Sequence, residues 1–587
     1  MILRFVGQLM DSGKIVAASE DSIQIQFEQK ICPEVNRQIS DFCEVFALMT
    51  KDMPEVLEIV PTYCSVNIYF DEKKSKCDLI KQIALEVLEK QQATGGVGIG
   101  AALGSEAGSR GLGGKIISIP VCYEDEEFAP DLELVAEHAG LSKQEVIKIH
   151  SSTDYLIYMM GFLPGFPYLG GMDGRLETPR LETPRTKIPA GSVAIGGAQT
   201  GLYPVESPGG WNIIGRTPVR LFDMKREPQF LYKAGDKIRF VPVTRAEFEN
   251  FDEEAWLKEL GISSENSQCG ESAKSAEQTY ECGGGIKILE PGLMTTVQDL
   301  GITGFQKYGI GQSGVMDEKS FALANRLCGN PENAACLETT LCGPEIRFIN
   351  PCDFAISGAD FACATLDGNP VQMNKRLHAA AGSVLKCGFA SKGLRSYIAF
   401  SGGLLVPQVF GSRSTNLKSK IGGYLGRKLE SGDELAIGWL RLNSQSSGEG
   451  VETKIVERDK NSPFLDPILP TSDVLVLDCI KSSQFDSFDS ESVKSFSSEV
   501  YTVSAESDRM GIRFSGPALE CGKTDIISDS IPFGAVQITS AGLPVVMAAD
   551  RQTTGGYAKI ACVKKHSMCL LAQAVPGTKV MFKIEEA

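Results

Sequence analysis

Two stretches of this chain, Ile188-Pro-Ala-Gly-Ser-Val-Ala-Ile195 and Ile531-Pro-Phe-Gly-Ala-Val-Gln-Ile538, are near copies that lie more than three hundred residues apart. Matched landmarks of this kind are typical of one β-rich unit that was used twice. The segment that follows each copy is rich in glycine, which favours a surface task over regular structure. Each copy is followed by a Gly-Gly-aromatic triplet and by a strand-like closing run, at residues 209–211, 235–240, 555–557 and 577–582.

The length and composition of the chain limit what it can be. Its 587 residues exceed what one hydrophobic core organises, so we expect about three to five domains. The formal net charge of −16 argues against nucleic acid or an anionic membrane as a partner, because both bind basic surfaces. The 17 cysteines form no Cys-x-x-Cys pair, and the N-terminal residues do not read as a signal peptide. We therefore expect a cytoplasmic protein that acts on a small molecule or on another protein.

Changes of pattern along the chain divide it into five segments. Residues 1–92 alternate strand-like and helical runs, which is typical of a small α+β domain. A Gly-rich stretch at 93–114 and a polar stretch at 261–285 are interpreted as linkers. Residues 115–260 become β-rich after two helices, and residues 286–587 form a second module. Two more segments of that module, Gly382-Ser-Val-Leu385 and Gly432-Asp-Glu-Leu435, resemble the closing run, so we expect it to contain two β-barrel halves.

Local signals predict where several helices lie. Apolar residues fall at helical spacing in residues 78–91. Ser142 and Glu145 have the spacing of a capping box, which would start a helix there. Residues 317–327 and 244–260 are also predicted to be helical.

The densest motif of the first half is Gly161-Phe-Leu-Pro-Gly-Phe-Pro-Tyr-Leu-Gly-Gly171. Alternating Gly, Pro and aromatic residues suit a rigid loop that presents backbone N–H groups to a ligand. The alternative is a structural turn with packed aromatic side chains. The predicted substrate-binding residues from this motif and the segments after it are Gly165, Phe166, Tyr168, Gln199, Tyr203, Gly209, Gly210 and Trp211.

The second module carries polar motifs at 504–511 and 550–557. Arginine offers a planar fork for a carboxylate or phosphate, and glycine-freed amides can complete an anion-binding nest. The alternative is that each Asp-Arg pair belongs to a structural ion pair. The predicted catalytic residues are Arg509, Asp550, Arg551 and Gln552, and the predicted substrate-binding residues are Thr553, Gly555, Gly556 and Tyr557.

Two further residues are weaker candidates. Arg413, in Gly411-Ser-Arg-Ser-Thr415, could bind substrate, although a tight turn with an exposed arginine is the simpler interpretation. His150 is the one histidine that remains a catalytic candidate, against a packing role in the core or at a helix end. The four histidines lack metal-ligand spacing, so no metal site is predicted. Gly522-Lys-Thr524 is no P-loop, because Pro517 occupies the position of the first glycine.

The first-half motifs resemble the B subunit of bacterial ATP-dependent 5-oxoprolinase, the KipI or allophanate hydrolase subunit 1 family. The segments that carry this resemblance are Gly161–Gly171, Ile188–Val193 and Ser207–Trp211. From Pro291 onward the chain resembles the C subunit of that enzyme, the KipA or allophanate hydrolase subunit 2 family, which is similar to biotin-dependent carboxyltransferases. The matching segments are Gly314–Asp317, Gly411–Thr415, Ser507–Gly511 and Ala549–Tyr557. The chain thus looks like a fusion of the two subunits, joined at 261–285.

This resemblance implies a mainly β protein with cyclophilin-like β-barrels in both halves, preceded by the small α+β domain. It implies a separate A-type subunit as partner and ATP, with Mg²⁺, as cofactor, while no biotin is expected on this chain. The implied reaction converts 5-oxo-L-proline, ATP and two waters into L-glutamate, ADP and phosphate. Donors such as Arg509, Arg551 and the Gly555–Gly556 amides would stabilise charge on the lactam oxygen. The sequence leaves the oligomeric state open, a homo-oligomer included.

Two alternative functions compete with the 5-oxoprolinase interpretation. The same barrels form the carboxyltransferase part of urea carboxylase, which would require a biotin carrier and a carboxylase on other chains. A regulator that binds a sensor kinase is the other alternative, and it leaves the polar motifs of the second module without a purpose. Fold resemblance does not separate these three functions.

Overall fold

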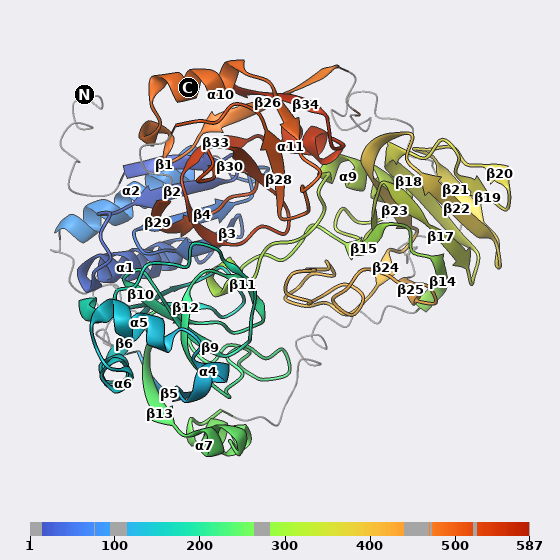
Figure 1. Ribbon diagram of the computed structural model, residues 1–587. Coiled ribbons are helices and arrows are strands. Elements are labelled where there is room, and N and C mark those ends of the chain that lie inside the picture. Colours follow the sequence, from blue (N-terminus) through green and yellow to red (C-terminus); the bar gives the residue numbers. More distant parts are fainter. Residues whose placement is uncertain are drawn as a thin grey trace.

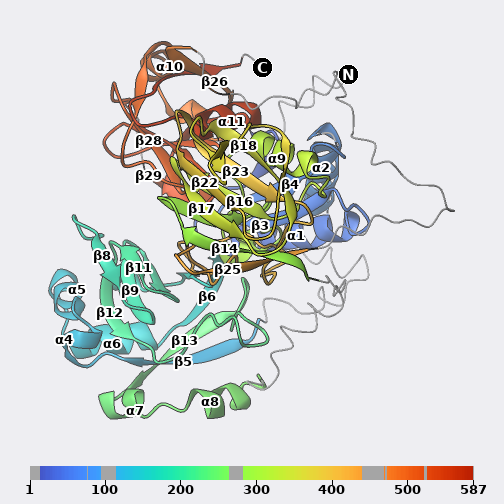
Figure 2. The same cartoon turned by 90° about the vertical axis from the view of Figure 1, so that its right-hand side faces the viewer.

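The computed structural model describes residues 14–75, 77–93, 114–262, 282–438, 469, 472–520 and 525–585. Most of the two expected linkers, at 94–113 and 263–281, lies outside these ranges, as does the 522–524 segment. Figures 1 and 2 show four units. The N-terminal domain lies against the C-terminal barrel, the first barrel lies below both in Figure 1, and a pair of sheets lies to one side. No helix in the described part is long and apolar enough to cross a membrane.

The N-terminal domain is a four-stranded antiparallel sheet in the order β1-β2-β4-β3, covered by two helices. The helices bury the face marked by their apolar spacing, so that Phe42, Phe46 and Ile80 pack on Ile23 and Ile68. The α+β prediction for this region is confirmed. The elements are β1 (Lys14–Ser19), β2 (Ser22–Gln26), α1 (Pro33–Met49), β3 (Val56–Pro61), β4 (Ser65–Phe70) and α2 (Cys77–Ala93).

The first barrel is a closed sheet of seven strands in the order β9-β10-β7-β6-β13-β5-β12. Its one parallel pair is β5 with β13, the predicted closing strand. Ser142 caps α6 in a full capping box with Glu145, as predicted. The strands are β5 (Ile116–Cys122), β6 (Asp154–Met160), β7 (Pro167–Gly170), β9 (Ser192–Gly196), β10 (Gln199–Leu202), β12 (Asn212–Arg216) and β13 (Lys237–Val243), with the outer two-stranded sheet of β8 (Arg185–Ile188) and β11 (Ser207–Gly209).

The helices of the first barrel are short and lie between or after its strands. The predicted helix at 244–260 forms two pieces, because Asp252 starts a new helix as its N-cap and accepts from the Ala255 N–H. The helices are α4 (Asp125–Phe128), α5 (Leu132–Ala139), α6 (Lys143–Ser151), η2 (Gly174–Leu176), α7 (Arg245–Glu249) and α8 (Glu253–Glu259).

The second barrel has the same order strand for strand, β30-β31-β28-β27-β34-β26-β33, and its parallel pair is β26 with β34. The barrel expected in each half is therefore confirmed. Its elements are β26 (Val474–Lys481), η5 (Phe485–Ser487), α10 (Ser490–Ser498), β27 (Tyr501–Val503), β28 (Gly511–Ser515), β30 (Ala535–Ile538), β31 (Pro544–Met547), β33 (Lys559–Val563), α11 (Lys565–Ala572) and β34 (Lys579–Ile584), with the two-stranded sheet of β29 (Asp525–Ser530) and β32 (Thr554–Tyr557).

The region between the two barrels is a sandwich of two open sheets, which corrects the expectation of a second barrel half there. One sheet has the order β20-β19-β22-β17-β14-β25-β24 and the other β15-β16-β23-β18-β21. Their inner faces share one core, in which Ile346 and Phe348 meet Phe354 and Ile398. The glycine turns that suggested barrel strands open β22 and β25, which belong to the same open sheet. A glycine before a strand marks a turn, but it does not specify whether the sheet closes into a barrel.

The sandwich also contains one long helix, which begins one residue after its N-cap Asp317, close to the prediction. Its elements are β14 (Cys282–Glu290), β15 (Met294–Gln298), η4 (Gln306–Tyr308), α9 (Glu318–Leu327), β16 (Cys336–Thr340), β17 (Cys342–Phe348), β18 (Cys352–Asp360), β19 (Thr365–Leu366), β20 (Asn369–Pro370), β21 (Arg376–Ala379), β22 (Val384–Phe389), β23 (Lys392–Phe400), β24 (Leu404–Leu405) and β25 (Glu434–Gly438).

Candidate functional site

Loops from both barrels and from the sandwich converge at one place, which we call the junction. It consists of residues 161–166, 308–314, 411–421, 508–511 and 550–555. Every motif that the sequence singled out in the second module contributes to it, together with the Gly-Pro-aromatic loop of the first barrel.

Close backbone contacts hold the first two of these loops together. The Gly165 N–H donates to the Tyr308 carbonyl at 2.8 Å. Gly309 has φ +82°, and a Cβ there would lie 2.1 Å from the Leu163 carbonyl oxygen. A Cβ on Gly161 would lie 2.3 Å from Oγ1 of Thr554, in the second barrel. Glycine is therefore required at these positions by the approach of one domain to another.

The 411–415 loop is fixed by a buried carboxylate that the sequence did not single out. Asp299 accepts from the Ser412 hydroxyl at 2.5 Å, the Ser414 hydroxyl at 2.6 Å and the Arg413 N–H at 2.7 Å. The Arg413 side chain donates to the Val406 carbonyl at 3.1 Å, so it also braces this loop. The loop then continues into a tight hairpin in which Asn416 and Ile421 exchange backbone hydrogen bonds.

Lys418 lies at the tip of that hairpin and reaches both barrels. Its Nζ lies 5.1 Å from the ring centroid of Phe162 and 3.8 Å from the sulfur of Met510. Burial lowers the pKa of the Lys418 ammonium, against the opposing effect of Asp508 and Asp550. No motif contains this lysine, so no sequence pattern pointed to it.

Arg509 and Asp550 form a buried ion pair, which agrees with the structural alternative for these residues. The guanidinium donates to Asp550 at 3.0 and 3.1 Å, to Glu338, and to the Gly314 carbonyl at 2.6 Å. Burial raises the pKa of the Asp550 carboxyl, and the charge of Arg509 opposes this. Because these hydrogen bonds already engage the guanidinium, we assign Arg509 to joining the sandwich and the second barrel.

Arg551 is 2% exposed and is held by two neighbours. Its Nε donates to the Ile531 carbonyl at 2.8 Å, and its Nη2 donates to Oε1 of Gln312 at 3.3 Å. Its guanidinium lies 5.7 Å from the ring centroid of Phe533. Burial lowers the pKa of Arg551, while Tyr69 and Asp21 act in the opposite direction.

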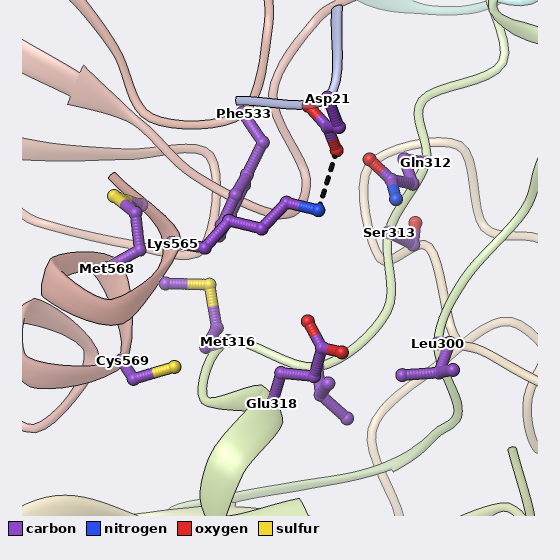
Figure 3. A pocket seen from close by; sticks show the side chains of 11 residues that line it. Asp21, Leu300, Gln312, Ser313, Met316, Glu318, Phe533, Lys565, Met568 and Cys569 are labelled. Atoms are coloured by element: carbon purple, nitrogen blue, oxygen red, sulfur yellow. Dashed lines mark ion pairs between the residues drawn. The ribbon is translucent and has the colours of Figure 1, made fainter. Parts of the chain in front are cut away.

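A small cavity of about 90 Å³ adjoins this arginine (Figure 3). Gln312 and Phe533, both neighbours of Arg551, are part of its wall. Figure 3 shows the Lys565 ammonium facing Asp21, to which it is joined at 2.9 Å. The other lining residues are Leu300, Ser313, Val315, Met316, Glu318, Met568 and Cys569.

The aromatic residues predicted in the first barrel form a packed cluster. The Phe166 ring centroid lies 5.0 Å from Tyr168, 5.3 Å from Tyr203 and 5.8 Å from Trp211, and all four are buried. This favours the packing alternative for Phe166, Tyr203 and Trp211. Tyr168 also faces the second barrel: burial raises the pKa of its hydroxyl, and Thr554 and Ser528 oppose this as hydrogen-bonding neighbours.

The remaining predicted residues fall into two groups. In the first barrel, Gln199 begins β10, Gly209 ends β11 and Gly210 lies in the turn after it. In the second barrel, Thr553 precedes β32, which contains Gly555, Gly556 and Tyr557; Gln552 lies beside Gly555. Tyr557 is 37% exposed.

His150 lies inside the core of the first barrel, far from solvent. Its two ring nitrogens contact the Tyr123 and Thr200 hydroxyls, each at 2.9 Å, and its ring stacks on Phe240. Burial lowers the pKa of His150 to about 3. The ring is thus neutral and enclosed, so the catalytic assignment is corrected in favour of the packing role.

A second buried carboxylate, Asp529, also went unrecognised in the sequence. It accepts from Lys559 at 3.0 Å and from two residues of the N-terminal domain, Ser65 at 2.6 Å and Gln24 at 2.9 Å. Burial raises the pKa of Asp529, but the Lys559 ammonium and these donors outweigh it and lower the pKa overall. The network joins the N-terminal domain to the two-stranded sheet of β29 and β32, and Figure 1 shows β29 beside β2 and β4.

A bound metal ion or nucleotide would need a suitable site among the described residues. Within the described ranges, no group of three or more His, Cys, Asp or Glu side chains could hold a metal ion. The cavity beside Lys565 is too small for ATP, because small-molecule sites usually enclose about 300 Å³ or more. This cavity therefore does not fit a nucleotide.

Comparison with known proteins places this geometry in a class. The family "Carboxyltransferase domain, subdomain C and D" matches residues 13–232, and "Carboxyltransferase domain, subdomain A and B" matches residues 308–584. The two barrels, the N-terminal domain and the sandwich thus define a protein of the carboxyltransferase-domain class, with its junction between the two matched regions.

Curated relatives narrow this class. The 5-oxoprolinase B subunit of Bacillus subtilis is 36% identical over 246 residues, which are 41% of this chain and 98% of that protein. The 5-oxoprolinase C subunit of Haemophilus influenzae is 34% identical over 299 residues, which are 51% of this chain and 90% of that protein. The chain belongs to the family of the 5-oxoprolinase B and C subunits, with both parts in one polypeptide.

Two other comparisons bear on the fold and on the alternative function. The crystal structure of TTHA0988 superposes with a TM-score of 0.76 at 28% identity, covering 96% of this chain and 99% of that one. The urea amidolyase of Lachancea kluyveri is 34% identical over 309 residues, which are 51% of this chain but 17% of that protein.

Proposed function

We propose that this chain is the fused B and C component of an ATP-dependent 5-oxoprolinase, active in the cytoplasm together with a separate A-type subunit. The observation that carries the proposal is the junction. Motifs from the B-like and C-like parts, distant in sequence, meet there in contacts so close that glycine is required. One site built by both parts explains why both are needed for one reaction.

The junction suits the chemistry of a small amide. Opening a lactam requires stabilisation of negative charge that develops on the carbonyl oxygen. Backbone amides at Gly555 and Gly556, the side chain of Gln552 and the ammonium of Lys418 are donors within or beside the junction. The neighbouring Arg551 is held in place by its hydrogen bonds to the Ile531 carbonyl and to Gln312. We assign no step to ATP on this chain, since the cavity beside Lys565 is too small for a nucleotide.

The test is to mix the purified chain with the A-type subunit and measure glutamate formed from 5-oxoproline and ATP. We expect glutamate only when both proteins and ATP are present. Absence of glutamate from a mixture in which the two proteins bind each other would refute the proposal. Lys418→Met, which keeps the length of the side chain but removes the charge, should lower kcat/KM by about tenfold or more. The Lys428→Met variant, outside the junction, serves as the control.

A carboxyltransferase component for urea or another amide is the second candidate, favoured by the two matched carboxyltransferase domain families. It predicts that the chain carboxylates an amide when a biotin carboxylase and a biotin carrier are supplied. Carboxylated product in that mixture, without glutamate in the first one, would select this candidate.

A further inference from the structure

The two barrels can be compared residue by residue, because they share an irregularity. In the first barrel Ala194 pairs with Ile213, and the register then shifts so that Val193 pairs with Gly215. In the second, Gln537 pairs with Lys559, and the same shift follows, with Val536 against Ala561. Ala194 and Gln537 therefore occupy one position of the fold, and Ile213 and Lys559 occupy another.

In the first barrel this outer position is apolar. Ala194 and Ile213 belong to the cluster that also contains Ile188, Tyr203 and Trp211. A Cβ on Gly209, in the covering strand β11, would lie 2.6 Å from the Tyr203 hydroxyl and 2.7 Å from Cδ1 of Ile188. The face is thus filled by the protein's own side chains.

In the second barrel the same face is polar although it is equally buried. Gln537 is 4% exposed and Lys559 is 2% exposed. A Cβ on Gly555, the counterpart of Gly209, would lie 2.8 Å from Cδ1 of Ile531, 2.7 Å from Nε2 of Gln552 and 3.4 Å from Nε2 of Gln537. Two side-chain amides therefore lie against the backbone of Gly555, where the first barrel has a tyrosine hydroxyl.

The partners of these groups differ. Lys559 is neutralised by Asp529 at 3.0 Å. Nε2 of Gln537 is buried and has no hydrogen-bond partner within the described part of the chain. A buried donor without a partner costs stability, and the first barrel shows that the fold accepts alanine at this position. The hydroxyl of Thr553 also lacks a partner among the described residues, but so does its counterpart Ser207, so it does not distinguish the barrels.

We propose that Gln537 is a substrate-binding residue whose side-chain amide, with that of Gln552, donates to the carbonyl oxygen of the small amide substrate beside Gly555. This deepens the proposed function and rests on it. The ion pair of Lys559 and Asp529 positions these groups: Asp529 pairs with Gly555 across the two-stranded sheet of β29 and β32, and Lys559 pairs with Gln537 across the barrel wall. The pair thus holds the two sides of the site together.

The decisive experiment combines activity with stability in the reconstituted enzyme. Gln537→Leu keeps a side chain of similar size and removes its amide group. We expect the KM for 5-oxoproline to rise about tenfold, the change that corresponds to about 1.4 kcal/mol, with the KM for ATP unchanged. We also expect the Tm of the chain to stay the same or rise, because an unpartnered buried group has been removed.

The matched control is another buried glutamine whose amide is fully engaged. Gln573 donates to Asp317 at 2.8 Å and to the Arg395 carbonyl at 2.9 Å. Gln573→Leu should lower the Tm and leave the KM for 5-oxoproline unchanged. An unchanged KM in Gln537→Leu, or a fall in its Tm like that of the control, would overturn the assignment of Gln537 while leaving the proposed function intact. Inactivity of the wild-type mixture would instead overturn the proposed function, and this inference with it.

Discussion

The two barrels have the same strand order, the same parallel pair and the same register shift, yet their outer faces are filled differently. The first barrel covers this face with aromatic and aliphatic side chains, whereas the second places amides and an ion pair there. Because the backbone is the same, neither hydrogen-bonding pattern nor topology explains the difference. The first barrel shows what the fold needs for stability, and departures from it in the second barrel indicate function.

The largest effect is expected from removing one member of the buried ion pair that the first barrel lacks. Asp529→Ala leaves Lys559 charged and buried, which should destabilise the second barrel by about 3–5 kcal/mol. The double variant Asp529→Ala with Lys559→Ile, which introduces the isoleucine of the first barrel, should recover most of this loss. Calorimetric Tm values of the wild type, the single variant and the double variant measure this recovery. A double variant as unstable as the single one would contradict the comparison of the two barrels.

The next effect concerns His150, a buried histidine of the first barrel. Its folded pKa of about 3 lies below the unfolded value of 6.5, so the unfolded chain binds more protons between these values. Stability should therefore fall by about 1.4 kcal/mol for each pH unit as the pH drops from about 6 towards 3. Urea unfolding of the first barrel, followed by fluorescence at several pH values, measures this slope. His150→Gln should have a smaller slope, and an unchanged slope would show that other groups cause the acid sensitivity.

The smallest effect concerns the starts of two helices, α6 and α11, which are capped in different ways. In the first barrel α6 is capped by its own Ser142, whereas α11 of the second has no side-chain cap and its Lys565 N–H donates to Glu20 of the N-terminal domain at 2.6 Å. Ser142→Ala should cost about 1 kcal/mol. Glu20→Ala should cost a similar amount and increase amide exchange in α11, measured by mass spectrometry. Protection of α11 that is unchanged in Glu20→Ala would mean that the cap across domains contributes nothing.

Much of the fold could be predicted because the barrel unit occurs twice in the sequence, so that a prediction for one copy can be compared with the other copy. The Ile-Pro-x-Gly turn, the Gly-Gly-aromatic triplet and the closing run each fell on the same element in both barrels. The sandwich could not be distinguished from a barrel half, since Gly382 and Gly432 only mark turns into strands. Whether a sheet closes into a barrel depends on which strands, distant in sequence, pair with each other. The residue pattern within one strand does not encode this pairing.

The site was predicted as a set of motifs but not residue by residue. The Gly161–Gly171 loop and the polar motifs of the second module do meet at the junction, while Arg509 is engaged in ion pairs and His150 is enclosed in a core. Lys418 and Asp529 were missed because each is a single residue outside any motif. Their roles come from neighbours that are distant in sequence, such as Phe162 for Lys418 and Gln24 for Asp529. Such contacts become visible only in the folded chain.

The N-terminal domain belongs in sequence to the B-like part but is bonded to the barrel of the C-like part through Gln24, Ser65 and Glu20. Where the two parts are separate polypeptides, an interface of this kind forms at a rate and to an extent that depend on how much of each is present. In one chain the parts are tethered, so their local concentration is fixed and their ratio is always one to one. The interlaced fold therefore makes the assembled state independent of dilution.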